Sequence, residues 1–282
     1  MSNLLKAIIN IVDNYTINIS NVTNGNNRAT NMGEGLETYI QNSFANNFIE
    51  EDEHQKKVNF RNTFSYKGTK NRIPDLILKN SDAIEIKKTE LLGDLQLNSS
   101  HPKSKLYSNQ NITEECKNCE NEAWEEKDII YTMGHIPKGT TQLKSLWFVY
   151  GICYAANKNV YQDIETTIKS SFHNIDNINI NTTGKELGKV KNIDSLNITY
   201  LRIRGMWVIK HPSKIFNDLY TQTNELFSMV AIIPQDKYNT FPIEDRRSIE
   251  QMETITISNE EISDPNNAAN SIAIKLILFK VD

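Results

Sequence analysis

Two short apolar runs, joined by a polar turn, constrain the fold of this chain more than any other stretch does. They span Ile73–Leu78 and Ala83–Lys88, and the residues between them are Lys79-Asn80-Ser81-Asp82. Short apolar runs on either side of a turn rich in Asn, Ser and Asp are typical of two antiparallel strands. We therefore predict a hairpin over these residues. Both runs also contain acidic residues, although strand interiors rarely hold charge for structural reasons alone.

The charged residues of this hairpin occupy positions that can converge. Side chains alternate between the two faces of a strand, so Glu85 and Lys87 share one face of the second strand. Ile84 and Ile86 share the opposite face, which we expect to pack on the core. Asp75 begins the first strand, a position where the preceding proline is tolerated. Two carboxylates and one ammonium can therefore project together from adjacent strands into a cleft or into solvent.

This trio suits the metal-assisted hydrolysis of a phosphodiester. Two carboxylates, helped by a backbone carbonyl such as that of Ile86, suit a hard cation such as Mg²⁺. Lys87 could position or deprotonate the attacking water and neutralise charge in the transition state. The same charges on an exposed strand would be an ordinary solvated face, and the spacing alone does not separate the two interpretations. Both acids lie in apolar runs joined by a tight turn, and this context favours a site.

Bulk composition indicates a globular chain and excludes a membrane protein. The 282 residues suffice for one large domain or for a core with a subdomain, and 38% are hydrophobic and 23% charged. The net charge of −4 gives no overall sign of nucleic-acid binding, but a local basic face remains compatible with it. The N-terminus is too short and too interrupted by charge for a signal peptide. Three cysteines, an odd number, argue against a disulfide framework and predict a cytoplasmic location.

The remaining hydrophobic pattern predicts both helices and strands, in the order expected of an α/β or α+β fold. We expect an N-terminal helix capped by Ser2 and a second helix carrying an apolar stripe of Leu36, Ile40 and Phe44. The apolar stretch Thr141–Ala156 is too long for an average strand, and Gly151 splits it. The other predicted elements are a helix over Ser213–Ile233 and strands over Phe60–Tyr66, Asn177–Asn181, Asn192–Ile203 and the last eleven residues.

Cys116 and Cys119 have the spacing of half a zinc site. A structural zinc site needs four ligands, and a second pair at matching spacing is absent from the sequence. Cys153, His101 or His135 could complete the set, but Cys153 lies in an apolar run that we expect in the core. The zinc interpretation is therefore not favoured.

The motif Pro74-Asp75 … Glu85-Ile86-Lys87 resembles that of the PD-(D/E)xK nuclease superfamily. The flanking stretches, GEGLETYIQNSFA upstream and LQLNSSHPKSKLY downstream, resemble more specifically the type II restriction endonucleases of the NgoPII family. The resemblance covers about residues 30–210. It implies a restriction-endonuclease-like core, in which a central mixed β-sheet is flanked by helices. We expect one nuclease domain over residues 1–282, with residues 211–282 packed on that core.

The resemblance also implies roles for individual residues. Asp75 and Glu85 would be metal ligands, together with the carbonyl of Ile86, and Lys87 would be the catalytic lysine. Many members of the superfamily add an acid from a helix before the hairpin. Glu37 is the first candidate here, with Glu34 as the second, and a solvated helix residue is the alternative interpretation.

The function implied is Mg²⁺-dependent cleavage of double-stranded DNA at a short palindrome, of which GGCC is an example. A homodimer in the bacterial cytoplasm would act on that palindrome, and a cognate DNA methyltransferase would protect the host. Two alternatives stay open. One is a repair or recombination nuclease with the same motif, and the other is a non-catalytic DNA-binding or interaction protein with a charged hairpin.

Two further segments offer groups for DNA. After the hairpin, Lys103 and Lys105 could contact phosphates, while Asn98, Ser99 and His101 could contact base edges or the backbone. A polar loop without contacts is the alternative there.

In YLRIRGMW, alternation places Arg202 and Arg204 on one face, suited to phosphate or guanine or simply to solvated charge at a sheet edge. Lys67, Lys70 and Arg72 precede Asp75 and could add phosphate contacts, although a surface role is favoured for them.

Overall fold

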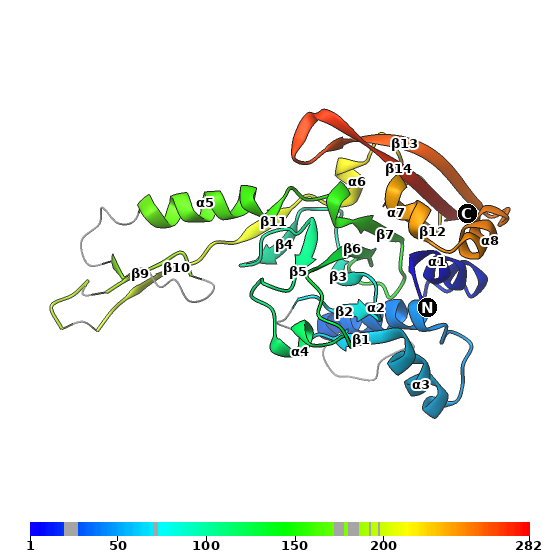
Figure 1. Ribbon diagram of the computed structural model, residues 1–282, viewed down its shortest axis with the longest axis horizontal. Coiled ribbons are helices and arrows are strands. Elements are labelled where there is room, and N and C mark those ends of the chain that lie inside the picture. Colours follow the sequence, from blue (N-terminus) through cyan, green and yellow to red (C-terminus); the bar gives the residue numbers. More distant parts are fainter. Residues whose placement is uncertain (20–27, 70–72, 172–177, 180–185, 192, 197) are drawn as a thin grey trace.

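The computed structural model describes residues 1–19, 28–69, 73–171, 178–179, 186–191, 193–196 and 198–282, and of residues 28–32, 178 and 179 it describes the backbone alone. Within this part of the chain, nine strands form one sheet (Figure 1). Eight of them lie side by side in the order β1-β2-β3-β6-β7-β12-β14-β13, and β5 pairs with β6 off that path. The pairs β3–β6 and β7–β12 are parallel and the others are antiparallel. The sheet is therefore mixed, as predicted.

The strands of this sheet are β1 (Phe64–Lys67), β2 (Leu76–Leu78), β3 (Ala83–Thr89), β5 (Lys105–Tyr107), β6 (Glu126–His135), β7 (Ser145–Tyr150), β12 (Phe227–Pro234), β13 (Ile255–Asp264) and β14 (Asn267–Val281). Two smaller sheets are also described. They pair β4 (Leu95–Asn98) with β11 (Trp207–Ile209), and β8 (Ile178–Asn179) with β9 (Gly188–Val190) and β10 (Leu201–Ile203). The described helices are α1 (Leu4–Asp13), α2 (Arg28–Ala45), α3 (Glu53–Thr63), α4 (Glu114–Lys117), the 3₁₀ turn η2 (Gly151–Cys153), α5 (Lys158–Ser171), α6 (Pro212–Ile215), α7 (Gln235–Thr240) and α8 (Ile243–Glu250).

Helix α2 covers one face of the sheet with the predicted apolar stripe, whose residues Leu36, Ile40 and Phe44 are all buried. The side chain of Leu36 approaches Gly134 of β6 so closely that an added Cβ would lie 2.7 Å from it. Glycine at this position therefore lets the helix pack directly on the strand. Helix α1 packs on α2, and its N-cap is Asn3 rather than the predicted Ser2, because the Asn3 side chain accepts the backbone N–H of Lys6.

The two faces of the sheet are distinguished by alternation along β7. Phe148 contacts Phe44 of α2 edge-on, with ring centroids 6.5 Å apart. Its neighbour Trp147 points to the opposite face and packs against His211 and Tyr220. The strand register then shows to which face the side chains of the other strands point, because residues directly opposite each other share a face. Glu85 of β3 lies on the Trp147 face, since it is paired through β6 to the residue two positions after Trp147.

An arm projects from this core, formed by α5 and the sheet β8–β9–β10 (Figure 1). None of the residues of α5 is buried. The arm joins the core through β11, which pairs antiparallel with β4. β4 follows the β2–β3 hairpin in the sequence and leads into residues 99–104, so the base of the arm lies next to that segment.

The predicted helix over Ser213–Ile233 is wrong. The structure has the short α6 and then the strand β12, whose eight residues are all buried between β7 and β14. A strand buried on both faces reads as a continuous apolar run, and such a run has no period that separates it from a buried helix. This segment is a strand because it pairs with β7 and β14, which are distant in sequence.

Two further boundaries differ from the prediction. The first predicted strand begins at Phe64 rather than Phe60, because α3 continues through Thr63 from an N-cap at Asp52. In the predicted strand Asn192–Ile203, the described residues form ladder pairs only over β10. The split at Gly151 is confirmed, since β7 ends at Tyr150 and η2 follows it.

The C-terminal part of the chain contributes β12, β13 and β14 to the central sheet, so it shares one hydrophobic core with the preceding strands. In the described part of the chain, no helix is long and apolar enough to cross a membrane.

Candidate active site

The hairpin β2–β3 holds Asp75 by its backbone and by its side chain. Its N–H donates to the carbonyl of Ile84 at 3.1 Å, and its carbonyl accepts from the N–H of Gly68 at 2.7 Å. The Oδ2 atom of Asp75 accepts from the N–H of Ile86 at 2.6 Å. The carboxylate is therefore fixed against β3, immediately beside the strand that carries Glu85 and Lys87.

Glu85 and Lys87 lie on one face of β3, as the alternation predicts. Glu85 is only 5% exposed, and its Oε1 lies 2.5 Å from the Nζ of Lys87. The other oxygen, Oε2, is buried and has no hydrogen-bond partner among the residues that the structure describes. Ile84 and Ile86 are buried on the α2 side of the same strand. A carboxylate oxygen in this position has lost its water without gaining a donor, which is costly unless something else binds it.

The charges of the site are strongly coupled. Burial, with a further contribution from the Glu85 carboxylate, raises the pKa of Asp75 to about 7. Burial lowers the pKa of Lys87, but the Glu85 and Asp75 carboxylates outweigh it, and the net result is a pKa above the ordinary value. Lys87 therefore stays protonated at neutral pH, while Asp75 titrates close to neutrality.

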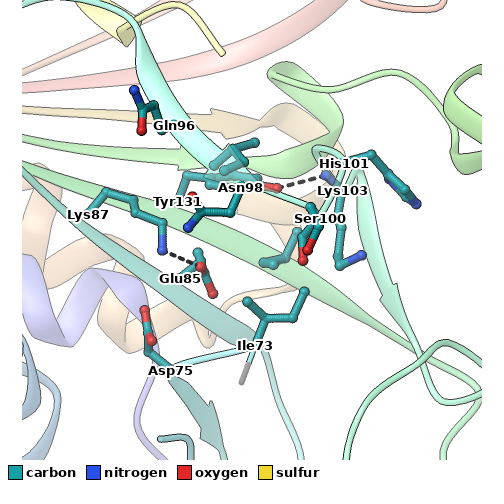
Figure 2. Close-up of a pocket in the computed structure, with 13 residues that line it drawn as sticks. Ile73, Asp75, Glu85, Lys87, Gln96, Asn98, Ser100, His101, Lys103 and Tyr131 are labelled. Atoms are coloured by element: carbon teal, nitrogen blue, oxygen red, sulfur yellow. Dashed lines mark hydrogen bonds and ion pairs between the residues drawn. The ribbon is translucent and has the colours of Figure 1, made fainter. Parts of the chain in front are cut away.

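These side chains open into a cavity of about 130 Å³ on the Trp147 side of the sheet (Figure 2). The segment that follows β4 forms its other wall. The cavity brings the predicted catalytic residues Asp75, Glu85 and Lys87 together with four of the predicted DNA contacts, Asn98, Ser99, His101 and Lys103. It also includes residues that the sequence did not indicate, which are Ile73, Gln96, Leu97, Ser100, Ile129 and Tyr131.

Tyr131 is the most important of the residues that the sequence did not indicate. It lies on β6 directly opposite Glu85, and its hydroxyl accepts the backbone N–H of Lys103 at 2.7 Å. It is 3% exposed. No sequence signal pairs residue 131 with residue 85, because the parallel pairing of β3 with β6 is a long-range event.

Aromatic contacts hold the wall segment to the base of the arm. The His101 ring stacks on Tyr161 of α5, with centroids 5.2 Å apart. Trp207 of β11 meets both rings edge-on, and its Nε1 donates to Glu165 of α5 at 3.1 Å. The position of the cavity wall therefore depends on the position of α5 and β11 relative to it.

The structure does not bring the remaining predicted residues into the cavity. Lys105 forms ion pairs with Glu126 and Asp128 at 2.5 and 3.9 Å. Arg202 and Arg204 lie on the arm, and both pair with Glu186.

The other candidates ahead of the hairpin also lie outside the cavity lining. Glu37 of α2 is near enough for its charge to add to the rise in the pKa of Asp75. Glu34 lies on the same helix, and Lys67 donates to the side chain of Gln41 at 3.3 Å. Lys70 and Arg72 are outside the described residues.

The donor set fits a hard divalent cation, although it is small. In the described residues, no group of three or more His, Cys, Asp or Glu side chains is placed to hold a metal ion, and this includes Cys116 and Cys119. Asp75 and Glu85 supply two carboxylates, and Oε2 of Glu85 is buried with no partner among the described residues. The half-buried Asp75 carboxylate and the buried Glu85 carboxylate repel each other, and a cation between them would remove that cost. Backbone carbonyls and water would complete the coordination.

Comparisons with known proteins place the chain in a family. Residues 2–263 match the family described as NgoPII restriction endonuclease. The chain is 42% identical over 280 residues to a protein of Neisseria gonorrhoeae named Type II restriction enzyme NgoPII, and the match covers 98% of this chain and 99% of that protein. No solved structure matches the chain significantly. From the family match and this full-length identity, the chain belongs to the NgoPII restriction endonuclease family.

Proposed function

We propose that this protein is a type II restriction endonuclease that hydrolyses both strands of duplex DNA, with Asp75, Glu85 and Lys87 at its catalytic centre. The observation that carries the proposal is one cavity in which the buried Glu85, the half-buried Asp75 and Lys87 face a wall of polar side chains. The family membership supports the same reaction.

Type II restriction endonucleases generally use divalent metal ions, and we propose Mg²⁺ as the ion used here. When bound, Mg²⁺ would supply a Lewis acid that polarises the phosphoryl oxygen and lowers the pKa of a bound water. Asp75 and Glu85 would hold it, with the carbonyl of Ile86 as a further donor and Glu37 as an acid that adds negative charge nearby. Lys87 is ion-paired to Glu85 and has a raised pKa, so it acts as a fixed positive charge that orients the nucleophilic water rather than as a base.

The cavity wall is suited to hold the DNA. Asn98, Ser99 and His101 offer donors and acceptors that can meet base edges or sugar and phosphate oxygens. Lys103 adds a positive charge next to them. Arg202 and Arg204 lie on the projecting arm, where they would contact phosphates outside the cleavage site. Lys105, two residues beyond Lys103, would contribute only through the long-range field of the surface.

We propose that two copies act together on a short palindrome such as GGCC. One chain has one Asp75–Glu85–Lys87 centre, whereas cutting both strands at a two-fold symmetric site suits one centre for each strand. A cognate DNA methyltransferase acting on the same palindrome would protect the host genome.

The proposal is tested by digesting a sequenced, unmethylated plasmid with the purified protein and Mg²⁺, and by reading the ends of the fragments. We expect discrete fragments that end at one short palindrome. Asp75→Ala and Glu85→Ala should each lower the cleavage rate by about 10³-fold or more, because each removes a ligand needed in the transition state. Binding of the same DNA should change by less than about tenfold, since phosphate and base contacts carry the affinity.

The outcomes separate the competing functions. Cleavage directed by DNA ends, junctions or lesions would favour a repair nuclease. Binding without any cleavage by the unmodified protein would favour a non-catalytic DNA-binding protein and would overturn the proposal.

A further inference from the structure

The backbone of Lys103 is fixed to the sheet at the back of the cavity. Its N–H donates to the hydroxyl of Tyr131, the residue opposite Glu85 in the β3–β6 pair. Gly151 lies against the same segment, and a Cβ on Gly151 would approach the carbonyl oxygens of Lys103 and Ser104 to 2.5 and 2.6 Å. The backbone of Lys103 is therefore held by Tyr131 through its N–H and lies against Gly151 through its carbonyl, which fixes the position of the Lys103 Cα.

The side chain of Lys103 is buried without a partner. The residue is 8% exposed and lines the cavity, where Glu85 lies between it and Lys87 (Figure 2). Its Nζ forms no hydrogen bond or ion pair with any residue that the structure describes. The other two lysines nearby are paired, Lys87 with Glu85 and Lys105 with Glu126. The side chain of Lys103 is mostly buried and lines the cavity, yet no described carboxylate pairs with its ammonium, which is costly. A role in binding an anion in the cavity is the simplest reason to keep it.

We infer that Lys103 is a second catalytic lysine, whose ammonium binds a non-bridging oxygen of the scissile phosphate on the side of the cavity opposite Lys87. This inference rests on the proposed function. In the reaction, the water oxygen bonds to phosphorus, the bond to one ester oxygen breaks, and that oxygen takes up a proton as the water loses one. The non-bridging oxygens carry the negative charge throughout. Because Lys87 is already ion-paired with Glu85, Lys103 supplies the ammonium of the cavity that is not ion-paired with a described carboxylate.

The electrostatics of Lys103 agree with this role. Burial lowers its pKa to about 8, against smaller opposing contributions from Glu85 and Glu165. The groups that face it are Glu85 of β3, the Tyr131 hydroxyl of β6, Glu165 of α5 and His101 of its own segment. A bound phosphate would stabilise the protonated amine, so the charge is strengthened when the DNA arrives.

The test compares Lys103→Met with the unmodified protein in three measurements. These are the single-turnover cleavage rate with Mg²⁺, the affinity for the same DNA with Ca²⁺ in place of Mg²⁺, and the midpoint of thermal unfolding. We expect the rate to fall by about 10²-fold or more, as when one transition-state donor is removed from an active site. The affinity should fall by less than about tenfold. The unfolding midpoint should stay or rise, because the substitution removes an unpaired buried charge. Lys103→Arg, which keeps the charge, should recover part of the rate.

Lys88→Met is the matched control. Lys88 is also a largely buried lysine of this region, but it lies on the other face of β3 from Lys87 and pairs with Glu90 at 2.9 Å. The Lys88→Met protein should cleave DNA at the same rate as the unmodified protein.

Each outcome decides the inference. If the unmodified protein cuts and Lys103→Met cuts within a few-fold of it, the inference is overturned and the proposed function stands. If Lys103→Met unfolds or loses stability, Lys103 has a structural role and the inference is again overturned. If the unmodified protein cuts no DNA, the proposed function fails and this inference fails with it.

Discussion

Asp75 illustrates at the scale of one residue how the fold prepares a carboxylate for a cation. Its side chain is packed against β3 and accepts the N–H of Ile86, while the Glu85 carboxylate lies nearby. Burial and the Glu85 charge together raise its pKa to about 7. A carboxylate in these surroundings is stabilised either by a proton or by a metal ion, and the two compete for it.

This competition predicts how stability depends on pH. The folded pKa of Asp75 lies above its unfolded value, so the folded state holds a proton that the unfolded state has lost between about pH 4 and pH 7. The stability from this group is therefore full below about pH 4 and is lost as the pH rises through 7. With EDTA present, we expect Asp75→Asn to raise the thermal midpoint relative to the unmodified protein at pH 8 but not at pH 4. The measurement is thermal unfolding across that range.

The same residue predicts a response to divalent ions. At pH 8, Mg²⁺ should raise the thermal midpoint of the unmodified protein, because the ion binds the folded state alone. Asp75→Asn should lose most of that rise. The control is Asp245→Asn, which changes a carboxylate that accepts a hydrogen bond from Asn3 and does not line the cavity, and it should keep the rise. An equal response to Mg²⁺ in all three proteins would contradict Asp75 as a ligand.

At the scale of elements, the β2–β3 hairpin is tied to the C-terminal part of the chain through its turn. Asp82 ends the β2–β3 turn and is almost fully buried. It accepts from Lys237 of α7 at 2.5 Å and from the Tyr150 hydroxyl at 2.7 Å, and Lys237 also pairs with Asp128 at 2.8 Å. The sequence predicted Asp82 only as a turn residue, because its partners are 68 and 155 positions away.

This tie predicts a stability effect that a double substitution partly reverses. Lys237→Met leaves the buried Asp82 carboxylate without its counter-charge, so it should lower the free energy of unfolding by about 3–5 kcal/mol. Asp82→Asn combined with Lys237→Met should recover a substantial part of that loss, because no buried charge remains. Urea unfolding of the two single variants and the double variant measures the coupling. If the double variant loses the sum of the two single losses in unfolding free energy, the Asp82–Lys237 pair does not stabilise the hairpin.

At the scale of the whole molecule, the cavity lined by Asp75, Glu85 and Lys87 and the arm beside it are the features on which the proposed DNA cleavage depends. The arm projects from the core at the edge where the cavity wall lies (Figure 1). His101, Tyr161 and Trp207 connect the two. Anything that contacts the arm therefore acts close to the cavity.

The proposed pairing of two chains predicts how mixed assemblies cut. Unmodified protein and Asp75→Ala protein, unfolded together and refolded at equal amounts, should form mixed pairs with one active centre. Such pairs should nick supercoiled plasmid, so open circles should accumulate beyond what either parent produces. Sedimentation of the unmodified protein should give twice the chain mass of 32.4 kDa. A protein that sediments as a single chain and yet cuts both strands without an intermediate nick would contradict the pairing.

The hairpin and the convergence of Asp75, Glu85 and Lys87 could be predicted because they depend on local rules. Alternation separates Glu85 and Lys87 from Ile84 and Ile86, and a short polar turn makes the two runs antiparallel. The helix with Leu36, Ile40 and Phe44 followed from a 3.6-residue period in the same way. In contrast, β12 was predicted as a helix, because its apolar run has no period and its partners are distant strands.

The sequence by itself determined the local geometry of this protein, because the alternation of side chains and the chemistry of a turn act over a few residues. It indicated two carboxylates and a lysine on neighbouring strands. Only the tertiary structure decided what surrounds them. The pairing of β3 with β6 places Tyr131 beside Glu85, and the segment after β4 closes the cavity with Lys103. Burial, and with it the electrostatics of the site, arises from contacts between residues far apart in the chain, which no local pattern encodes.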